Sequence, residues 1–349
     1  MEKEYQKVKT VYEEQGRSYH EYNNEGKNHS TIVGVKTDAG KHDFDAVILA
    51  TGGASYPLTG STGDGYRMAA EVGHTIVPLK PALVPVECEE KWARELMGLS
   101  LKNVVLRAYA PEKSKKTKSG EPFPGKYSAN ESGNAEKGGY ACSAAENTAK
   151  IEKKQKKRKP VYEELGEMLF THFGVSGPLV LSASSYLADS PNGALLEIDL
   201  KPGLTAEQLD LRILRDFEAA PNREIQNVLG ALLPRLMIPV VLERAEIPPD
   251  RKAHDLTKGE RRRLLETLKG FRIPVSGPRP ITEAIITAGG VKVGEVDPKT
   301  MASKKTEGLY FAGELLDVDA YTGGFNLQIA WATGRAAGES AAERLRDSQ

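Results

Sequence analysis

Cysteine is scarce in this sequence, which has Cys88 and Cys142 as its two cysteines among 349 residues. Two cysteines without a C-x-x-C spacing cannot build a disulfide framework, a zinc ribbon or a dithiol redox centre. The six histidines are scattered and lack the spacing of metal-ligand pairs. We therefore expect no metal site.

The sequence also lacks a formal net charge and any long run of apolar residues. The 48 Lys and Arg residues balance the 48 Asp and Glu residues, so the formal net charge is zero. This balance disfavours a protein that grips nucleic acid or an anionic membrane over its whole surface. No stretch approaches the ~20 apolar residues of a membrane span, and the start carries no signal peptide. We expect a cytoplasmic protein without a membrane partner, for which nucleic acid is an unlikely ligand; the oligomeric state is left open.

The chain is nevertheless long and apolar enough to fold into about two domains. Hydrophobic residues make up 39% of it and charged residues 28%, which supplies a sizeable core and a polar surface. The low-complexity stretch 111–160 is the exception, because it has hardly any large aliphatic residues, and we expect it to be disordered. Its basic run 153–159 is most simply a solvated segment, although it could associate with RNA.

The first ordered region has the pattern of a strand, a glycine-rich loop and a helix. Residues 45–50 are nearly all apolar, which is typical of a parallel strand covered on both faces. The following loop leads to a helix over 66–73, with Asp64 as its predicted N-cap and Gly73 as its stop. This unit predicts an α/β fold with a Rossmann-like domain.

The end of the chain has the same character. Residues 285–291 and 308–312 read as strands that run into glycines, and a long helix is predicted over 325–345, where Gly334 and Gly338 would allow close packing. The two ends are therefore predicted to form one domain, from residues 1–85 and 279–349. Residues 86–278 form the inserted domain, with a helical subdomain at 205–270 that begins with a capping box of Thr205 and Gln208.

Three glycine-rich segments are predicted to meet at one edge of the parallel sheet. They are 50–53 after the first strand, 312–314 after the last strand, and 323–326 before the long helix. Open α/β sheets bind ligands at the carboxyl ends of their strands, and glycine lets the backbone approach a flat or phosphorylated ligand. The start of the long helix would favour an anion, because its free N–H groups carry partial positive charge.

Four long motifs in this sequence resemble the BaiN/RdsA-type flavoproteins, a family of NAD(P)/FAD-dependent oxidoreductases that includes aminoacetone oxidases. The motifs occupy residues 47–66, 73–85, 169–178 and 309–328. The resemblance implies FAD as the cofactor, NAD(P)H as a possible electron donor and a small-molecule substrate. It does not distinguish an oxidase from a reductase.

The resemblance also implies which residues bind the cofactor. Val8 would meet the adenine, the loop after the first strand would run along the FAD, Gly313 and Glu314 would follow the strand that meets the ribityl-diphosphate, and the long helix would face the isoalloxazine. For Glu314 the alternative is a local structural acceptor. The predicted cofactor-binding residues are Val8, Ala50, Thr51, Gly52, Gly53, Gly313, Glu314, Gly323, Gly324, Phe325, Asn326 and Leu327.

The sequence departs from that family at its start, where a strand followed by a G-x-G-x-x-G turn is expected and none is found. Residues 60–65 contain three glycines, but at another spacing and in another place. We therefore expect the chain to begin partway through the FAD domain. Either the gene start is truncated or part of the cofactor site has been lost, and in the second case the alternative function is a cofactor-free binding or interaction protein.

No catalytic acid or base follows from the residues. His172 between two phenylalanines and Tyr321 beside the glycine pair are the candidates for the substrate face, with packing as the alternative role for His172. His74 is expected to be a cation at the end of the first helix.

Overall fold

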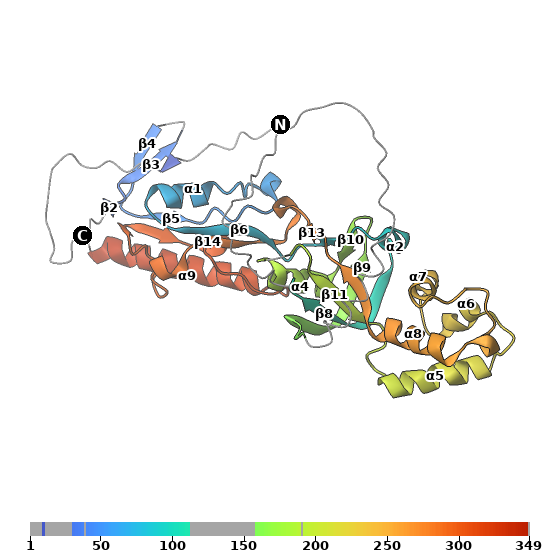
Figure 1. Ribbon diagram of the computed structural model, residues 1–349. Helices are drawn as coiled ribbons and strands as arrows, with labels where there is room; N and C mark the ends of the chain where they lie inside the picture. Colours follow the sequence, from blue (N-terminus) through green and yellow to red (C-terminus); the bar gives the residue numbers. More distant parts are fainter. Residues whose placement is uncertain (1–8, 11–29, 38–39, 112–157, 190, 348–349) are drawn as a thin grey trace, which may run out of the picture.

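The computed structural model describes residues 9–10, 30–37, 40–111, 158–189 and 191–347 (Figure 1). The predictions made for Val8, for most of the basic run 153–159 and for nearly all of the low-complexity stretch lie outside the described residues. Within them, no helix is both long enough and apolar enough to cross a bilayer.

Both ends of the chain contribute to a Rossmann-like α/β part. Its strands form a parallel pair, β5 and β16, a second parallel pair, β2 and β15, and the antiparallel pair β6 and β14. Helices α1 and α9 lie on opposite sides of this thin layer of strands (Figure 1). The elements are β5 (Val47–Leu49), β16 (Leu309–Phe311), β2 (Ser30–Thr31), β15 (Thr306–Glu307), β6 (Ile76–Ala82), β14 (Ile286–Val291), α1 (Asp64–Glu71) and α9 (Phe325–Asp347), beside a small sheet of β1 (Lys9–Thr10), β3 (Gly34–Thr37) and β4 (Gly40–Asp43).

The middle of the chain forms a seven-stranded antiparallel sheet of order β12-β11-β8-β9-β10-β7-β13. Helix α4 (Pro178–Leu187) packs on β9 and β8 and, as Figure 1 shows, lies on the side of this sheet nearer to α9. The strands are β7 (Val86–Glu87), β8 (Ser100–Tyr109), β9 (Tyr162–Phe170), β10 (Gly174–Ser176), β11 (Leu195–Asp199), β12 (Phe271–Pro274) and β13 (Gly277–Pro278), with the short helix α2 (Lys91–Glu95) between β7 and β8.

A group of helices lies at the end of the molecule farthest from the Rossmann-like part (Figure 1). It contains α5 (Ala206–Glu218), α6 (Ile225–Val228), α7 (Met237–Arg244) and α8 (Lys258–Lys269). The predicted capping box is confirmed, because Thr205 Oγ1 accepts from the Gln208 amide at 3.2 Å and Gln208 Oε1 accepts from the Thr205 amide at 2.9 Å.

The buried apolar residues separate along the same lines. One large cluster takes its members from Val86 to Val275, and a second combines Ile32 to Val72 with Val291 to Ala341. Each cluster takes its residues from a different part of the chain. This distribution supports the predicted domain boundaries at residues 85 and 278, which stay a prediction.

Three sequence expectations are wrong in detail. Gly63, with φ of 82°, occupies the N-cap of α1, and Asp64 is the first helical residue. Ile48 in β5 is 39% exposed within the described part of the chain, so this strand is not covered on both faces. An added Cβ at Gly334 or Gly338 would meet no described atom within 4 Å, so these glycines do not mark close packing.

His74, expected to be a cation at the end of the first helix, is instead buried in surroundings that disfavour its charged form. Its side chain is fully buried, its Nε2 lies 2.7 Å from Ser303 Oγ and its Nδ1 lies 3.4 Å from Glu295 Oε2. Burial lowers the pKa of His74, although the charge of Glu295 opposes the shift. Burial by itself would raise the pKa of Glu295, but hydrogen bonds from Lys305 and Thr75 lower it to about 2.

We expect the stability of the protein to fall on acidification. Both groups have a lower pKa in the folded chain, so the unfolded chain binds more protons as the pH drops below about 6.5 for His74 and about 4.5 for Glu295. The free energy of unfolding should fall between about pH 7 and about pH 4, by about 1 kcal/mol through Glu295 and by a further amount through His74. Urea unfolding at each pH measures it, and His74→Gln should reduce the slope above about pH 5. An unchanged slope in that variant would contradict the assignment.

Candidate functional site

Two of the three glycine-rich segments lie side by side at one edge of the parallel pair. Leu49 of β5 is opposite Phe311 of β16, and the Ala312 amide donates to the Leu49 carbonyl at 3.0 Å. Because the strands are parallel and in register, residues 50–53 and 313–314 leave the sheet at the same edge. This is the edge where open α/β sheets accommodate ligands.

The glycines of these segments have different local roles. Gly52 and Gly313 both have φ of 74°, the left-handed region that disfavours other residues. Gly53 is needed for packing, since an added Cβ would lie 2.5 Å from Glu314 Oε1 and 2.6 Å from Thr287 Oγ1. The backbone at Gly53 is therefore closed on that side by the protein itself.

Glu314 is a structural acceptor between the two segments. Its Oε1 accepts from the Thr287 amide at 2.6 Å and from Ser55 Oγ at 3.2 Å, and Tyr66 donates its hydroxyl to the Glu314 carbonyl at 3.2 Å. Burial raises the pKa of Tyr66 and the charge of Glu314 adds to the rise, so this hydroxyl keeps its proton. The contacts favour the structural role over the ribityl contact, which stays a prediction.

The third segment lies along α9, away from the first two. The Gly313 amide donates to Thr333 Oγ1 at 2.9 Å, so the middle of α9 packs on the strand ends. A helix rises about 1.5 Å per residue, which places the start of α9 at Phe325 about 12 Å from Thr333 along its axis. The three segments therefore border an elongated region rather than a point.

The start of α9 is open. Gly323 and Gly324 have φ of 105° and 93°, and an added Cβ at Gly324 would meet no described atom within 4 Å. Phe325 and Leu327 are each 59% exposed. The side chain of Asn326 is held by the preceding loop, because it accepts a hydrogen bond from the Ala320 amide at 2.9 Å and donates one to the Ala320 carbonyl at 2.8 Å. It thereby shapes the loop that leads into the helix.

The two residues proposed for the substrate face lie in different surroundings. His172 is exposed at the tip of the turn between β9 and β10, with its ring 4.9 Å from the ring of Phe173. Tyr321 lies 5.8 Å, ring to ring, from Tyr186 of α4, where the Rossmann-like part meets the central sheet. Close to Tyr321 in the chain, burial raises the pKa of Asp319 and the charge of Asp317 adds to the rise. Tyr321 therefore lies at the junction of the two parts, whereas His172 lies on an exposed turn, and a role of either residue at the substrate face stays a prediction.

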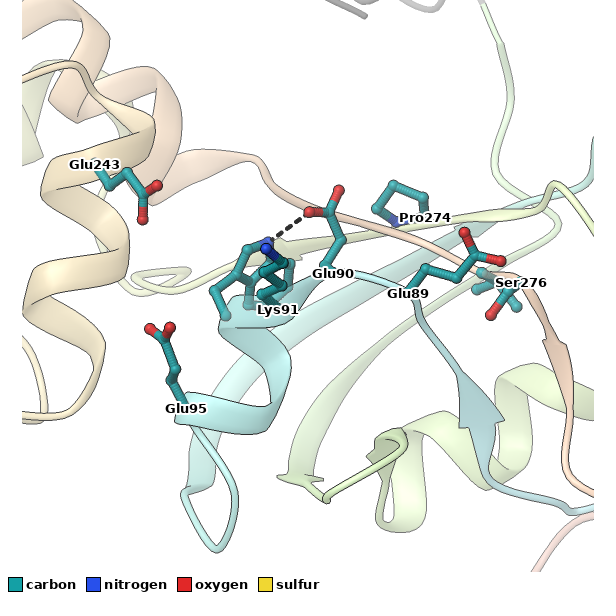
Figure 2. Close-up of a pocket in the computed structure, with 9 residues that line it drawn as sticks. Glu89, Glu90, Lys91, Glu95, Glu243, Pro274 and Ser276 are labelled. Carbon is teal, nitrogen blue, oxygen red and sulfur yellow. Dashed lines mark hydrogen bonds between the residues drawn. The ribbon is translucent and has the colours of Figure 1, made fainter. Parts of the chain in front are cut away.

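A cleft of about 710 Å³ lies elsewhere, between α2, α7 and the end of β12 (Figure 2). Four glutamates and one lysine line it, and the Trp92 ring nitrogen donates to Glu90 at 3.1 Å. This excess of negative charge would repel the diphosphate of a dinucleotide. The cleft is lined by Glu89, Glu90, Lys91, Trp92, Glu95, Glu243, Pro274, Val275 and Ser276.

The residues at the sheet edge fit part of a dinucleotide. Two positive-φ turns side by side and an open helix start about 12 Å away suit an extended anionic ligand with a flat end. Sequence reasoning missed Ser55, Thr287 and Tyr186, since only tertiary contacts bring them to the site. The contact of each predicted residue with FAD stays a prediction.

One family model and three relatives are similar to this chain. The model of the HI0933-like protein Rossmann domain matches residues 5–340. A 3-dehydro-bile acid delta(4,6)-reductase from Clostridium scindens is 29% identical over 313 residues, which cover 89% of this chain and 65% of the relative. Ribosomal RNA dihydrouridine synthases from Escherichia coli and Haemophilus influenzae are each 28% identical over 289 residues, or 83% and 82% of this chain and 58% of each relative. The chain thus spans less than two thirds of the length of these relatives.

Proposed function

Because the chain belongs to the HI0933-like Rossmann-domain family, we propose that it is a flavin-dependent oxidoreductase with FAD as its cofactor. The observation that carries the proposal is the parallel, in-register pairing of β5 and β16, which brings residues 50–53 and 313–314 to one edge of the sheet. Except for Val8, the predicted cofactor-binding residues lie either at this edge of the sheet or at the start of α9.

The chain's own residues would bind and orient the cofactor. The turns at Gly52 and Gly313 allow the backbone to approach the extended part of the ligand, and the open backbone at Gly324 accepts its flat end. FAD, when bound, supplies hydride transfer. The partial positive charge at the start of α9 stabilises the negative charge that a reduced flavin carries.

The names of the relatives suggest the kind of substrate. A delta(4,6)-reductase and a dihydrouridine synthase both saturate a ring carbon–carbon double bond. We extend this to the chain as a proposed small-molecule substrate with an unsaturated ring, reduced with electrons that come from NAD(P)H through the flavin. The expectation that nucleic acid is not a ligand stays a prediction, and the ribosomal RNA enzymes argue against it.

The alternative is a cofactor-free binding or interaction protein. The flavoprotein and the cofactor-free protein differ in absorbance between about 350 and 500 nm, because a bound flavin absorbs visible light. The absorbance of the purified chain is measured before and after addition of FAD. We expect a flavin spectrum that stays with the protein after gel filtration. A colourless chain that takes up no FAD would overturn the proposed function for this chain.

A single methyl group at the start of α9 should weaken FAD binding. Gly324→Ala puts a Cβ into the open space at a backbone φ of 93°, which costs about 1 kcal/mol of stability. If the flat end of FAD approaches this backbone, its affinity should fall at least about tenfold, since about 1.4 kcal/mol corresponds to that factor. A fluorescence titration of FAD measures the change.

Gly73→Ala is the matched control for this variant. Gly73 has φ of 86° and equally open surroundings, but it lies at the far end of α1. The control should lose similar stability and keep the FAD affinity of the unmodified chain. Equal affinity in both variants would show that the start of α9 does not meet the cofactor.

A further inference from the structure

Three tyrosine rings form a continuous ladder where the central sheet meets the Rossmann-like part. The rings of Tyr162 in β9 and Tyr186 in α4 are 5.5 Å apart and tilted by 40°, and those of Tyr186 and Tyr321 are 5.8 Å apart and tilted by 41°. These separations are within the range of favourable aromatic pairs. The ladder therefore joins the central sheet to the loop that enters α9.

The ladder is buried at one end and open at the other. Tyr162 is 5% exposed, whereas Tyr186 and Tyr321 are 44% and 42% exposed. Tyr162 donates its hydroxyl to Glu164 at 2.7 Å, and burial together with that carboxylate raises its pKa. The inner ring, Tyr162, is therefore fixed in place and keeps its hydroxyl proton. The outer two rings are partly exposed to solvent.

Helix α4 holds the middle ring in place. Ser184 Oγ accepts from the Val84 amide at 2.9 Å, and Ser185 Oγ accepts from the Leu83 amide at 3.3 Å. These two amides belong to the connection between β6 and β7, which passes from the Rossmann-like part into the central sheet, and Leu83 is held there with φ of 50°. Tyr186 follows directly in the chain, so these two hydrogen bonds hold the helix that carries it against the connection between β6 and β7.

We propose that Tyr186 and Tyr321 form one wall of the substrate site and stack on a planar unsaturated ring. The proposal rests on the proposed function, because Tyr321 lies two residues before the glycine pair where the flat end of FAD is expected. A ring held there would continue the ladder beside the flavin. Tyr186 and Tyr321 are then specificity-determining residues that select substrates by the flatness of the ring rather than by its charge.

The test measures binding of two probes that share the ring chemistry, uridine and testosterone. Ligand-observed NMR titrations use the full chain, with and without saturating FAD. We expect one of the probes to bind and Tyr186→Ala to weaken that binding about tenfold, as loss of a stacking ring does. Tyr186→Phe keeps the ring and should stay within about twofold.

Leu211→Ala is the control, since Leu211 is 66% exposed on α5, far from the ladder. It should leave probe binding unchanged. If Tyr186→Ala lowers the melting temperature by more than the control, Tyr321→Ala supplies a second measurement and should give the same loss. Binding of neither probe, or equal binding by Tyr186→Ala and the unmodified chain, would overturn the proposal.

The outcome is separable from that of the proposed function. FAD uptake by Tyr186→Ala should equal that of the unmodified chain, because the tyrosine wall faces the substrate and not the cofactor. Failure of the chain to take up FAD would overturn the flavin proposal, and the titrations without FAD would still decide whether the ladder binds a ring.

Discussion

Replacing Gly290 by alanine is expected to destabilise the Rossmann-like part strongly. An added Cβ would lie 2.6 Å from the Leu315 carbonyl oxygen and 3.0 Å from Cε1 of Tyr66, and the backbone φ of 127° is unfavourable for alanine. Strain and overpacking each cost about 1–3 kcal/mol, so we expect a loss of about 4 kcal/mol. That is a large share of the stability of a typical domain.

Urea unfolding followed by circular dichroism measures this loss. Gly294→Ala is the control, because Gly294 lies a few residues further on and an added Cβ there would meet no described atom within 4 Å. It should change the free energy of unfolding by less than about 0.5 kcal/mol. Similar losses in the two variants would mean that the close approach of Gly290 to Leu315 is not what limits stability.

Removing the carboxylate of Glu314 is the second change expected to have a large effect. In Glu314→Ala the amide of Thr287, a residue that is 1% exposed, loses its acceptor, and Ser55 loses a partner. An unsatisfied buried donor costs about 1–3 kcal/mol, and the space left by the side chain adds to it. We expect the ligand-free chain to lose about 3 kcal/mol in a chemical unfolding experiment.

Glu314→Gln separates the structural role from a cofactor contact. The amide oxygen can still accept from Thr287, so the loss should be only about 1 kcal/mol. If Glu314 acted on the ribityl chain of FAD alone, Glu314→Ala would weaken FAD binding and leave the ligand-free stability unchanged. That result would contradict the role assigned here.

Much of the local structure was predictable from the sequence. The apolar runs that become β5, β14 and β16, the capping box of α5 and the start of α9 at Phe325 follow from hydrophobic periodicity and from residues that cap or break a helix. These signals are carried by neighbouring residues, so no knowledge of distant contacts is needed. The glycine-rich segments that mark the candidate site belong to the same class of signal.

Two of the errors arose where distant segments meet. The sequence predicts a cation at His74, but burial against Phe311 and Ser303 removes its charge. Hydrophobic patterning predicts full cover for β5, but exposure depends on which other elements reach that strand. The neighbouring residues in the sequence determine neither the burial of His74 nor the exposure of β5.

The main strands of the Rossmann-like part, the helix α9 and the glycine turns follow from the amino-acid sequence alone, because these depend on contacts within a few residues along the chain. Only the tertiary structure decided that Glu314 bonds to Thr287, that Gly290 has no room for a side chain, and that Tyr186 lies against Tyr321. Each of these pairs joins separate segments, and their meeting is set by packing of the whole chain rather than by local preference.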